Sequence, residues 1–367
     1  MRLKVTGLCL IVLLSACSTN KPANTSPYIN AELAQVSPQT APLKQRILLL
    51  GDAGHSAIDP LQPSLEKAIN RATLAPEKTT VVMLGDNIYF FGFPNKDEDE
   101  QYSASQLEDI SHLEAQLQIA KRSGAEMYIV PGNHDWYADQ VDSQAQYIED
   151  YARDNQLQAE FAPHRVNADP LPEIIHRDGI SIVFLDSQWL IKAEETSYQQ
   201  AIEHLEQLLQ TTARDYPDNL LLLTAHHPME TMGPHNGYYT HRGYQFAMFM
   251  LELFRENDQD IEHPRYQRMI NDMERLLADK KSVFAAGHDH SLQVFKDPEG
   301  NGPQYRLVSG AANTSKVSGV GTSDTTDFAL SQEGFMELDI LANGILLKVY
   351  DIYNEQPVHQ QWLWQPE

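Results

Sequence analysis

Short apolar runs alternate with amphipathic stretches over the first three quarters of the chain. Runs of apolar and β-branched residues predict buried strands at 46–50, 79–84, 125–130, 181–185, 220–223 and 282–285. Helices are predicted between them, over 61–74, 107–122, 140–153, 198–209 and 265–278. This alternation of strands and helices is typical of the α/β class.

The pattern changes in the last quarter, where strands follow one another without helices. Strands are predicted there at 304–309, 334–340 and 345–353. A hairpin is also predicted earlier in the chain, over 174–180, with its turn at Asp178-Gly179. The chain has 367 residues, of which 42% are hydrophobic, so it can bury a large core. We therefore predict two packed sheets with helices outside them, in a single domain over 44–367.

One strand end combines a sharp turn with a carboxylate and a tyrosine. The strand at 79–84 runs into Gly85, which lets the backbone turn, and Asp86 follows at the end of the strand. Functional sites of α/β sheets lie at the carboxyl ends of strands. A carboxylate there can bridge two cations, and Tyr89 is close enough in sequence to reach back toward the same point.

Other predicted strands also end in groups that can ligate a metal. These are Asp52, Asn133, His226 and the pair His288 and His290. Each has an ordinary reading alone, because aspartate after glycine is a common turn residue, asparagine caps helices, and a histidine can be satisfied in a core. Oxygen and imidazole groups that all follow apolar strands together predict a metal site.

The N-terminus has the features of a targeting segment. Arg2 and Lys4 precede an apolar run at 8–14 that is too short to span a membrane. Leu14-Ser15-Ala16-Cys17 resembles the bacterial lipobox, although an ordinary signal peptide with an incidental cysteine would fit the same residues. We predict a signal peptide over 1–16, then a lipidated Cys17 and a flexible polar tether over 17–43.

The formal net charge of −24 argues against a protein that binds nucleic acid, because such proteins carry basic patches. A solvated acidic surface is the simplest interpretation of this charge.

Five motifs, in this order, resemble the calcineurin-like metallophosphoesterases and, within them, the small purple acid phosphatases. The motifs are Gly51-Asp52-Ala53-Gly54, Gly85-Asp86-Asn87-Ile88-Tyr89, Gly132-Asn133-His134-Asp135, His226-His227-Pro228 and Gly287-His288-Asp289-His290. The resemblance covers 46–313. It implies a four-layer α/β/β/α sandwich of two mixed β-sheets flanked by helices.

The resemblance also implies two metal ions that share one carboxylate. The first ion would take Asp52, Asp86, Tyr89 and His290, and the second Asp86, Asn133, His226 and His288. The wider superfamily has a histidine where this chain has Gly54, and Tyr89 fills that gap in the purple branch. His55 is one position too far along, and His227 is the alternative to His226. Tyr89 could instead only pack below the site, with its hydroxyl on a backbone carbonyl.

The metal identities follow from the tyrosine. A free tyrosine has a pKa near 10, roughly, so only a strong Lewis acid keeps it ionised at acid to neutral pH. Fe(III) meets that demand, with Fe(II), Zn(II) or Mn(II) beside it. The implied reaction is hydrolysis of a small phosphate ester, a phosphomonoester, by a metal-bound hydroxide.

The resemblance assigns the remaining catalytic work to three residues. His134 would protonate the leaving group and contact the phosphate, Asp135 would orient or charge-stabilise His134, and His235 would face the substrate. The gap between His226 and His288, which contains the segment 229–264, is longer than in the small mammalian form. Its His241, Arg242 and tyrosines at 238, 239 and 244 could form a lid that selects the substrate, or could simply pack.

Two other functions stay open at this point. A phosphodiesterase acting on nucleotides or lipid headgroups could use the same metals, and a catalytically inactive envelope-binding lipoprotein could share the fold. We expect a lipid-anchored protein of the bacterial envelope, on the outer membrane if there is one, because Ser18 rather than aspartate follows Cys17. No sequence feature predicts a protein partner.

Overall fold

The computed structural model describes residues 26–31, 33, 41–97, 101–165, 169–236, 238, 258–313 and 317–365. The predicted signal peptide and Cys17 lie outside these residues, as do most of the tether and His241, Arg242, Tyr239 and Tyr244. Within the described part, no helix has both the length and the apolar character needed to cross a membrane.

The first sheet has seven strands in the order β15-β14-β13-β2-β3-β4-β5. Their bounds are β2 Leu43–Leu50, β3 Thr79–Leu84, β4 Glu126–Val130, β5 Ala159–Phe161, β13 Gly334–Leu341, β14 Gly344–Asp351 and β15 His359–Trp364. Strands β2 to β5 run parallel, and β13, β14 and β15 are antiparallel to their neighbours. The sheet is therefore mixed.

The second sheet has eight strands in the order β1-β12-β10-β11-β9-β8-β7-β6. Their bounds are β1 Tyr28–Ile29, β6 Glu173–Arg177, β7 Ile180–Phe184, β8 Leu220–Thr224, β9 Ser282–Ala286, β10 Leu292–Lys296, β11 Tyr305–Ser309 and β12 Thr326–Leu330. The strands β7, β8, β9 and β11 pair in parallel, whereas β6, β10, β12 and β1 pair antiparallel.

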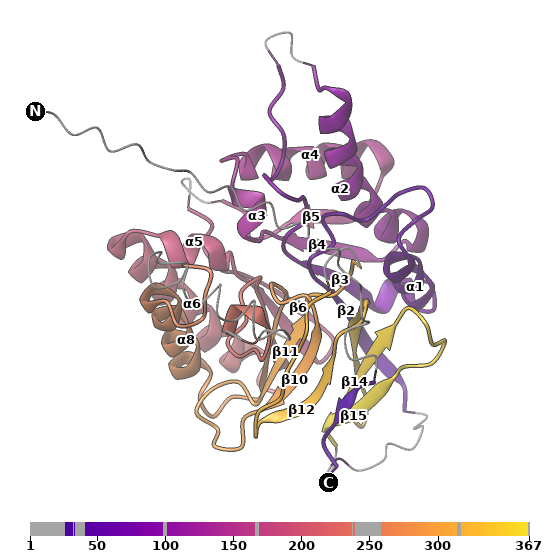
Figure 1. Ribbon diagram of the computed structural model, residues 1–367. Coiled ribbons are helices and arrows are strands. Elements are labelled where there is room, and N and C mark those ends of the chain that lie inside the picture. The colour runs from indigo at the N-terminus through magenta and orange to yellow at the C-terminus, as the bar shows by residue number, and fades with distance from the viewer. Residues whose placement is uncertain are drawn as a thin grey trace, which may run out of the picture.

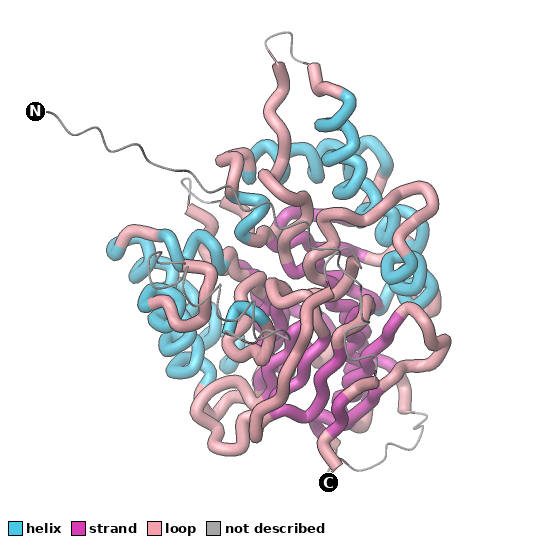
Figure 2. Tube along the Cα trace, viewed as in Figure 1, coloured by secondary structure: helices cyan, strands magenta, loops and turns pink. Residues whose placement is uncertain are grey.

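The two sheets pack face to face, and helices cover both outer faces (Figures 1 and 2). The helices α1 Pro63–Ala72, α2 Ala104–Ser123 and α4 Val141–Asn155 cover the seven-stranded sheet. The helices α5 Ser187–Lys192, α6 Glu195–Asp215 and α8 Pro264–Leu277 cover the eight-stranded sheet. The described residues also contain short turns of helix, namely α3 Asn133–Trp136, η1 Pro76–Lys78 and η2 Pro234–Asn236. The predicted four-layer α/β/β/α sandwich is confirmed.

The alternation along each strand explains why the sheets can be buried on both faces. On β2, Ile47 and Leu49 point into the core between the sheets, whereas Leu48 and Leu50 point outward to the helices. All four are fully buried. Continuous apolar runs of this kind are typical of parallel strands covered on both sides.

The structure contains several elements that the sequence did not predict. These are the strands β5, β10, β12 and β15 and the helix α5. Tyr28 and Ile29, inside the predicted tether, pair with Ala329 and Phe328 on β12. The predicted hairpin at 174–180 is confirmed as the β6–β7 pair.

Candidate metal centre

The parallel register brings the predicted ligands to one edge of the sandwich. Leu50 pairs with Met83, and Leu84 with Val130, so β2, β3 and β4 end side by side. In the other sheet, Gly287 N–H donates to the carbonyl of His226 at 3.0 Å. The two sheets meet where His288 N–H donates to Asp52 Oδ2 at 2.8 Å.

Three of the predicted ligand residues have a backbone conformation that is uncommon outside glycine. The φ angles are 61° at Asp52, 53° at Asp86 and 71° at His288. Aspartate and histidine tolerate this region better than most residues, and strained backbone of this kind clusters at functional sites. The turns after β2, β3 and β9 are therefore bent toward one another at a local energetic cost.

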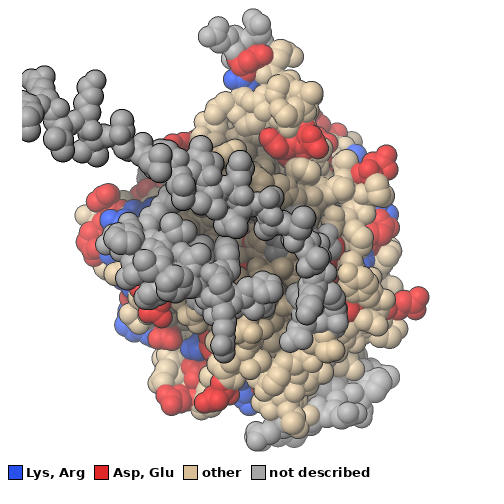
Figure 3. All heavy atoms as spheres, in the orientation of Figure 1, with Lys and Arg blue, Asp and Glu red and all other residues tan. Residues whose placement is uncertain are grey.

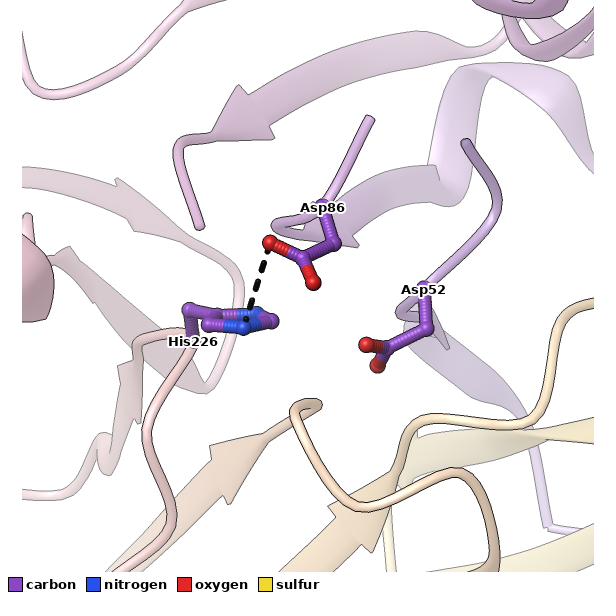
Figure 4. A group of neighbouring side chains, drawn as sticks. All are labelled: Asp52, Asp86 and His226. Carbon is purple, nitrogen blue, oxygen red and sulfur yellow. Dashed lines mark ion pairs between the residues drawn. The ribbon is translucent and has the colours of Figure 1, made fainter. Parts of the chain in front are cut away.

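Asp52, Asp86 and His226 form the centre of the site (Figure 4). One candidate ligand atom from each lies within 4.8 Å of the others, and all three side chains are buried. His226 Nε2 is 3.4 Å from Asp86 Oδ1. Figure 4 shows the Asp86 carboxylate between the other two side chains, as a bridging ligand requires.

His226 Nε2 and His288 Nδ1 face each other, because the other nitrogen of each ring bonds a backbone carbonyl. The Nδ1–H of His226 donates to the carbonyl of Leu84 at 2.9 Å, and the Nε2–H of His288 donates to that of Gln259 at 3.0 Å. The opposite nitrogens, His226 Nε2 and His288 Nδ1, are 3.1 Å apart, and Asn133 Oδ1 is 3.0 Å from His226 Nε2. Burial, with the charges of neighbouring histidines, holds the pKa of His288 well below its usual range.

Three possible ligand atoms therefore surround His226 Nε2, namely Asp86 Oδ1 at 3.4 Å, Asn133 Oδ1 at 3.0 Å and His288 Nδ1 at 3.1 Å. Oxygen and imidazole nitrogen atoms this close together can serve as ligands of one cation. Two imidazoles, an amide oxygen and a carboxylate form a donor set that suits Zn(II), Mn(II) or Fe(II). The backbone carbonyls of Leu84 and Gln259 orient the imidazoles, as second partners of metal-binding histidines do.

Tyr89 belongs to the neighbouring group, with Asp52 and His290. Its hydroxyl donates to Asp52 Oδ1 at 3.0 Å and lies 3.1 Å from His290 Nε2, which is itself 3.3 Å from Asp52 Oδ1. The hydroxyl thus contacts a carboxylate, in contrast to the alternative in which it bonds a backbone carbonyl. Burial, then the charges of Asp52 and Asp86, raises the pKa of Tyr89 well above its usual value. Only a strong Lewis acid could displace that proton at neutral pH.

Asp52 shows the opposite balance. Burial would raise the pKa of this carboxyl, but the charge and hydrogen bond of His290, together with His226 and Tyr89, lower it. The Asp52 carboxyl therefore favours its anionic form, which is the form that binds a cation.

Gly54 has no room for the histidine that the wider superfamily carries at this position. A Cβ there would lie 2.7 Å from the carbonyl of Asp86 and 2.9 Å from the amide nitrogens of Ile88 and Tyr89. The backbone that carries Tyr89 occupies this space instead. His55 packs beside the group, with its ring centroid 4.9 Å from those of Tyr89 and Phe90.

His227 points away from the site. Its Nδ1 lies 2.8 Å from Ser187 Oγ, and its Nε2 lies 2.8 Å from Gln259 Oε1. Burial holds its pKa well below the usual range. Of the two adjacent histidines, the structure thus brings His226 to the metal centre.

His134 lies at the rim of the site, with its ring partly exposed. Its backbone N–H donates to Asp86 Oδ1 at 3.0 Å. Its Nδ1 lies 2.7 Å from the carbonyl of Phe90, which can only accept, so Nδ1 carries the hydrogen. The Nε2 atom then faces the site, 3.9 Å from Asp86 Oδ2.

Asp135 links the two turns beside the site. Its carboxylate accepts hydrogen bonds from the backbone of Gly132 and Asn87 and from the side chains of Asn87 and Gln144. These bonds tie the turn after β3 to the turn after β4, and none of them reaches the ring of His134. That Asp135 orients or charge-stabilises His134 stays a prediction. Burial and the charge of Asp86 raise its pKa to about 6.

His235 stacks on His288, with ring centroids 3.8 Å apart. Its Nδ1 lies 3.9 Å from Asp260 Oδ1, and its backbone N–H donates to Asp289 Oδ1 at 3.3 Å. Burial lowers the pKa of His235, but Asp260 and Asp289 outweigh burial and raise it. His235 therefore lies beside the metal centre in a form that is readily protonated.

Sequence reasoning missed the residues that support the ligands. Ser187 Oγ accepts from the backbone N–H groups of His226 and His227, and Gln259 contacts both His227 and His288. No pattern marked Ser187 or Gln259. Asp289, which also contacts Thr231, had a signal, because it lies within the Gly-His-Asp-His motif.

A family model described as calcineurin-like phosphoesterase matches residues 45–292, which is more than half of the chain. The chain belongs to this family. Members usually bind two metal ions, and this member has a candidate metal cluster at the end of its strands. The match ends before β11, so the later strands of both sheets lie beyond it.

Two solved structures share the fold over most of the chain. One is described as GAP50, the anchor in the inner membrane complex of Plasmodium, with 14% identity, a TM-score of 0.55 and coverage of 89% of this chain and 90% of that one. The other is PhoD, with 12% identity, a TM-score of 0.50 and coverage of 90% of this chain and 73% of that one. No curated protein matches the sequence. At these identities the likeness concerns the fold alone.

Proposed function

We propose that this chain is a binuclear-metal phosphatase of the purple acid phosphatase type that hydrolyses phosphomonoesters. The observation that supports it best is the pair of ligand groups on either side of Asp86, with the hydroxyl of Tyr89 in the first group, 3.0 Å from Asp52 and 3.1 Å from His290. A phenol among carboxylate and imidazole ligands favours a trivalent ion.

Asp52, Asp86, Tyr89 and His290 would hold Fe(III). Asp86, Asn133, His226 and His288 would hold Fe(II), Zn(II) or Mn(II). When bound, such a pair supplies an activated water and neutralises the charge of the phosphate. The pair keeps net positive charge after its anionic ligands are counted. A phosphate dianion can bind there despite the acidic surface, because exposed charges are screened beyond about 8 Å at physiological salt.

His134 has the geometry to protonate the leaving oxygen. In its imidazolium form, Nδ1–H stays on the carbonyl of Phe90, and Nε2–H points into the site. The fixed Nδ1 contact orients the ring, so little orientational freedom is lost at the moment of transfer. His235, whose pKa is raised by Asp260 and Asp289, would carry positive charge toward the phosphate.

The same proposal places the enzyme on a bacterial envelope membrane through a lipid on Cys17. The lipobox-like residues 14–17 and the polar stretch after them support it. The acidic side chains fit a solvated surface, since on the face drawn in Figure 3 the visible ones lie in several separate places.

The two rival functions make different demands. A diesterase would use the same ligands, and nothing in the described residues favours it over a monoesterase. A catalytically inactive envelope-binding lipoprotein would not need seven ligand groups to converge. GAP50, which shares the fold, is described as an anchor.

A panel of chromogenic mono- and diesters, with metal analysis of the same sample, tests the proposal. We expect about two metal ions per chain, iron among them, and faster hydrolysis of monoesters at acid to neutral pH. Faster hydrolysis of diesters would select the first rival. Metal-loaded protein that hydrolyses neither class would select the second.

A further inference from the structure

Two large aromatic rings stay half exposed beside His134. The exposed fraction is 44% for Phe90 and 49% for Tyr137. The ring centroid of Tyr137 lies 4.7 Å from that of His134, and the ring centroid of Phe90 lies 6.2 Å from it. Single exposed aromatic residues are common, but two rings that touch the same imidazole at the rim of a site form a local apolar surface.

Both rings are held in place by the residues of the site. The carbonyl of Phe90 accepts the Nδ1–H of His134 at 2.7 Å, and the ring of Phe90 packs against His55 with centroids 4.9 Å apart. The hydroxyl of Tyr137 accepts a hydrogen bond from Asn133 Nδ2 at 2.6 Å. Because the rings are already oriented, a ligand that stacks on them does not have to order them first.

The position of these rings is defined relative to the leaving group. For His134 to protonate the leaving oxygen, its Nε2 must lie about 2.6–3.2 Å from that oxygen. The group attached to the oxygen then lies next to the rings that touch His134. Aromatic rings attract one another at centroid distances of about 4.5–7 Å, a range that a ring bonded directly to the leaving oxygen can reach.

We infer that Phe90 and Tyr137 form an aromatic subsite for the leaving group and that the preferred substrates are aryl phosphate monoesters. The inference rests on the proposed function, because it takes His134 as the proton donor. An alkyl group of similar size would fill the same space but would gain less, because it has no π face. Phe90 and Tyr137 carry no charge, so they would distinguish leaving groups by their shape and not by their charge.

Binding of two phosphonates to the metal-loaded protein tests the subsite without any turnover. In benzylphosphonate and cyclohexylmethylphosphonate, a methylene group takes the place of the leaving oxygen, and the two differ only in the aromaticity of the ring. We expect the wild type to bind benzylphosphonate more tightly by calorimetry. Phe90→Leu should weaken benzylphosphonate binding roughly 2- to 10-fold and leave cyclohexylmethylphosphonate within about 2-fold.

Two further comparisons isolate the rings. Phe91→Leu is the matched control, since Phe91 is 78% exposed and has no ring contact with His134 within the described chain. It should change neither affinity. At Tyr137 the comparison is Tyr137→Phe against Tyr137→Leu, since both lack the hydroxyl that Asn133 contacts and only the second lacks the ring. Only Tyr137→Leu should lose the preference for benzylphosphonate.

The outcomes separate the subsite from the proposed activity. Equal affinities of the wild type for the two phosphonates, or equal losses of both in Phe90→Leu, would overturn the subsite. Phenyl phosphate and a fluorinated alkyl phosphate with an equally acidic alcohol then serve as substrates. If neither is hydrolysed while benzylphosphonate is preferred, the proposed function fails and the aromatic subsite stands. If both are hydrolysed equally well, the proposed function stands and the substrate preference fails.

Discussion

At the residue scale, the site depends on which imidazole nitrogen carries a hydrogen. The carbonyls of Leu84 and Gln259 each accept from one imidazole N–H, so the opposite nitrogens, His226 Nε2 and His288 Nδ1, are the ones that face each other. The kinds of ligand were visible in the sequence because each follows an apolar strand. The tautomers were not, because Gln259 reaches His288 from a distant part of the chain.

The first residue-scale prediction concerns Tyr89. A phenolate bound to Fe(III) absorbs in the visible, so oxidised protein purified with iron should be purple or pink. Tyr89→Phe should lose the band and keep part of its activity, because the attacking oxygen does not come from the tyrosine. Tyr147→Phe is the matched control. The hydroxyl of Tyr147 bonds Glu114 on α2, away from the site, so its removal should leave the colour unchanged. A colourless wild type with Fe(III) at this site would contradict the assignment, whereas one containing only Zn(II) or Mn(II) would indicate a change of metal.

The second residue-scale prediction concerns His134. Proton donation typically contributes 10²–10⁴-fold, roughly, so His134→Ala should lower kcat for alkyl phosphates by about that factor. Esters whose leaving alcohol is very acidic need less protonation of the leaving oxygen, so their kcat should fall less. Metal content should not change, because the contact of His134 with Asp86 is made by the backbone N–H and survives the substitution. An equal loss for both kinds of ester would leave His134 with phosphate binding alone.

At the element scale, the sequence predicted the parallel strands well and the antiparallel ones less well. The strands β2, β3, β4, β8 and β9 are apolar on both faces, so their runs are continuous in sequence. The strands β12 and β15 contain Asp327, His359 and Gln361, which are buried and paired with one another or with Asn30. Asp327 bonds Gln361 and Asn30, which lie 34 and 297 residues away in sequence, so no local pattern could reveal that this polar residue belongs to a strand.

Close packing of the turns after β2 and β3 gives a prediction at Gly54. A Cβ there would approach the backbone of Asp86, Ile88 and Tyr89 to within 2.7–2.9 Å, and backbone atoms cannot move aside as a side chain can. Gly54→Ala should therefore displace the ligand-bearing turn and lower metal content, measured by elemental analysis after dialysis. Gly300→Ala is the control, since nothing lies within 4 Å of that Cβ. It should keep its metals and lose only a little stability from its positive φ. Full metal content in Gly54→Ala would show that the turn can rearrange.

The start of α5 gives a prediction about pH. Asp186 caps this helix, with a carboxylate that accepts from Trp189 N–H and Trp136 Nε1–H, and burial raises its pKa to about 7. Between about pH 4 and pH 7 the folded state keeps a proton that the unfolded state releases, so this group makes stability fall with rising pH, by at most about 1.4 kcal/mol per pH unit.

Asp186→Asn removes this titration and keeps an oxygen for the helix cap. The variant should therefore gain stability relative to the wild type as the pH rises from 4 to 7, and the difference should level off above that. Urea unfolding at matched metal content measures it. Asp178→Asn, at the exposed β6–β7 turn, is the comparison variant. A difference for Asp186→Asn that does not change with pH would show that the carboxyl is ionised throughout the range.

At the scale of the whole molecule, two sheets are needed to complete one site. The seven-stranded sheet supplies Asp52, Asp86 and Asn133, the eight-stranded sheet supplies His226 and His288, and the bond from His288 N–H to Asp52 Oδ2 joins them. The order of strands and helices predicted this sandwich. The extension by β1 could not be predicted, because two residues in a polar stretch carry no periodicity.

The last prediction is about where this sandwich is held. Tyr28 and Ile29 pair with β12, so the chain joins the eight-stranded sheet only about ten residues after Cys17. A lipid on that cysteine would therefore keep the domain close to a membrane. In the native host, Cys17→Ser should abolish labelling by a radioactive or clickable fatty acid and shift the protein from the membrane to the soluble fraction, while phosphatase activity per molecule stays the same. Ser18→Ala, beside it, should remain labelled and membrane-bound. A Cys17→Ser protein that stays in the membrane fraction after a salt wash would rule out the lipid anchor.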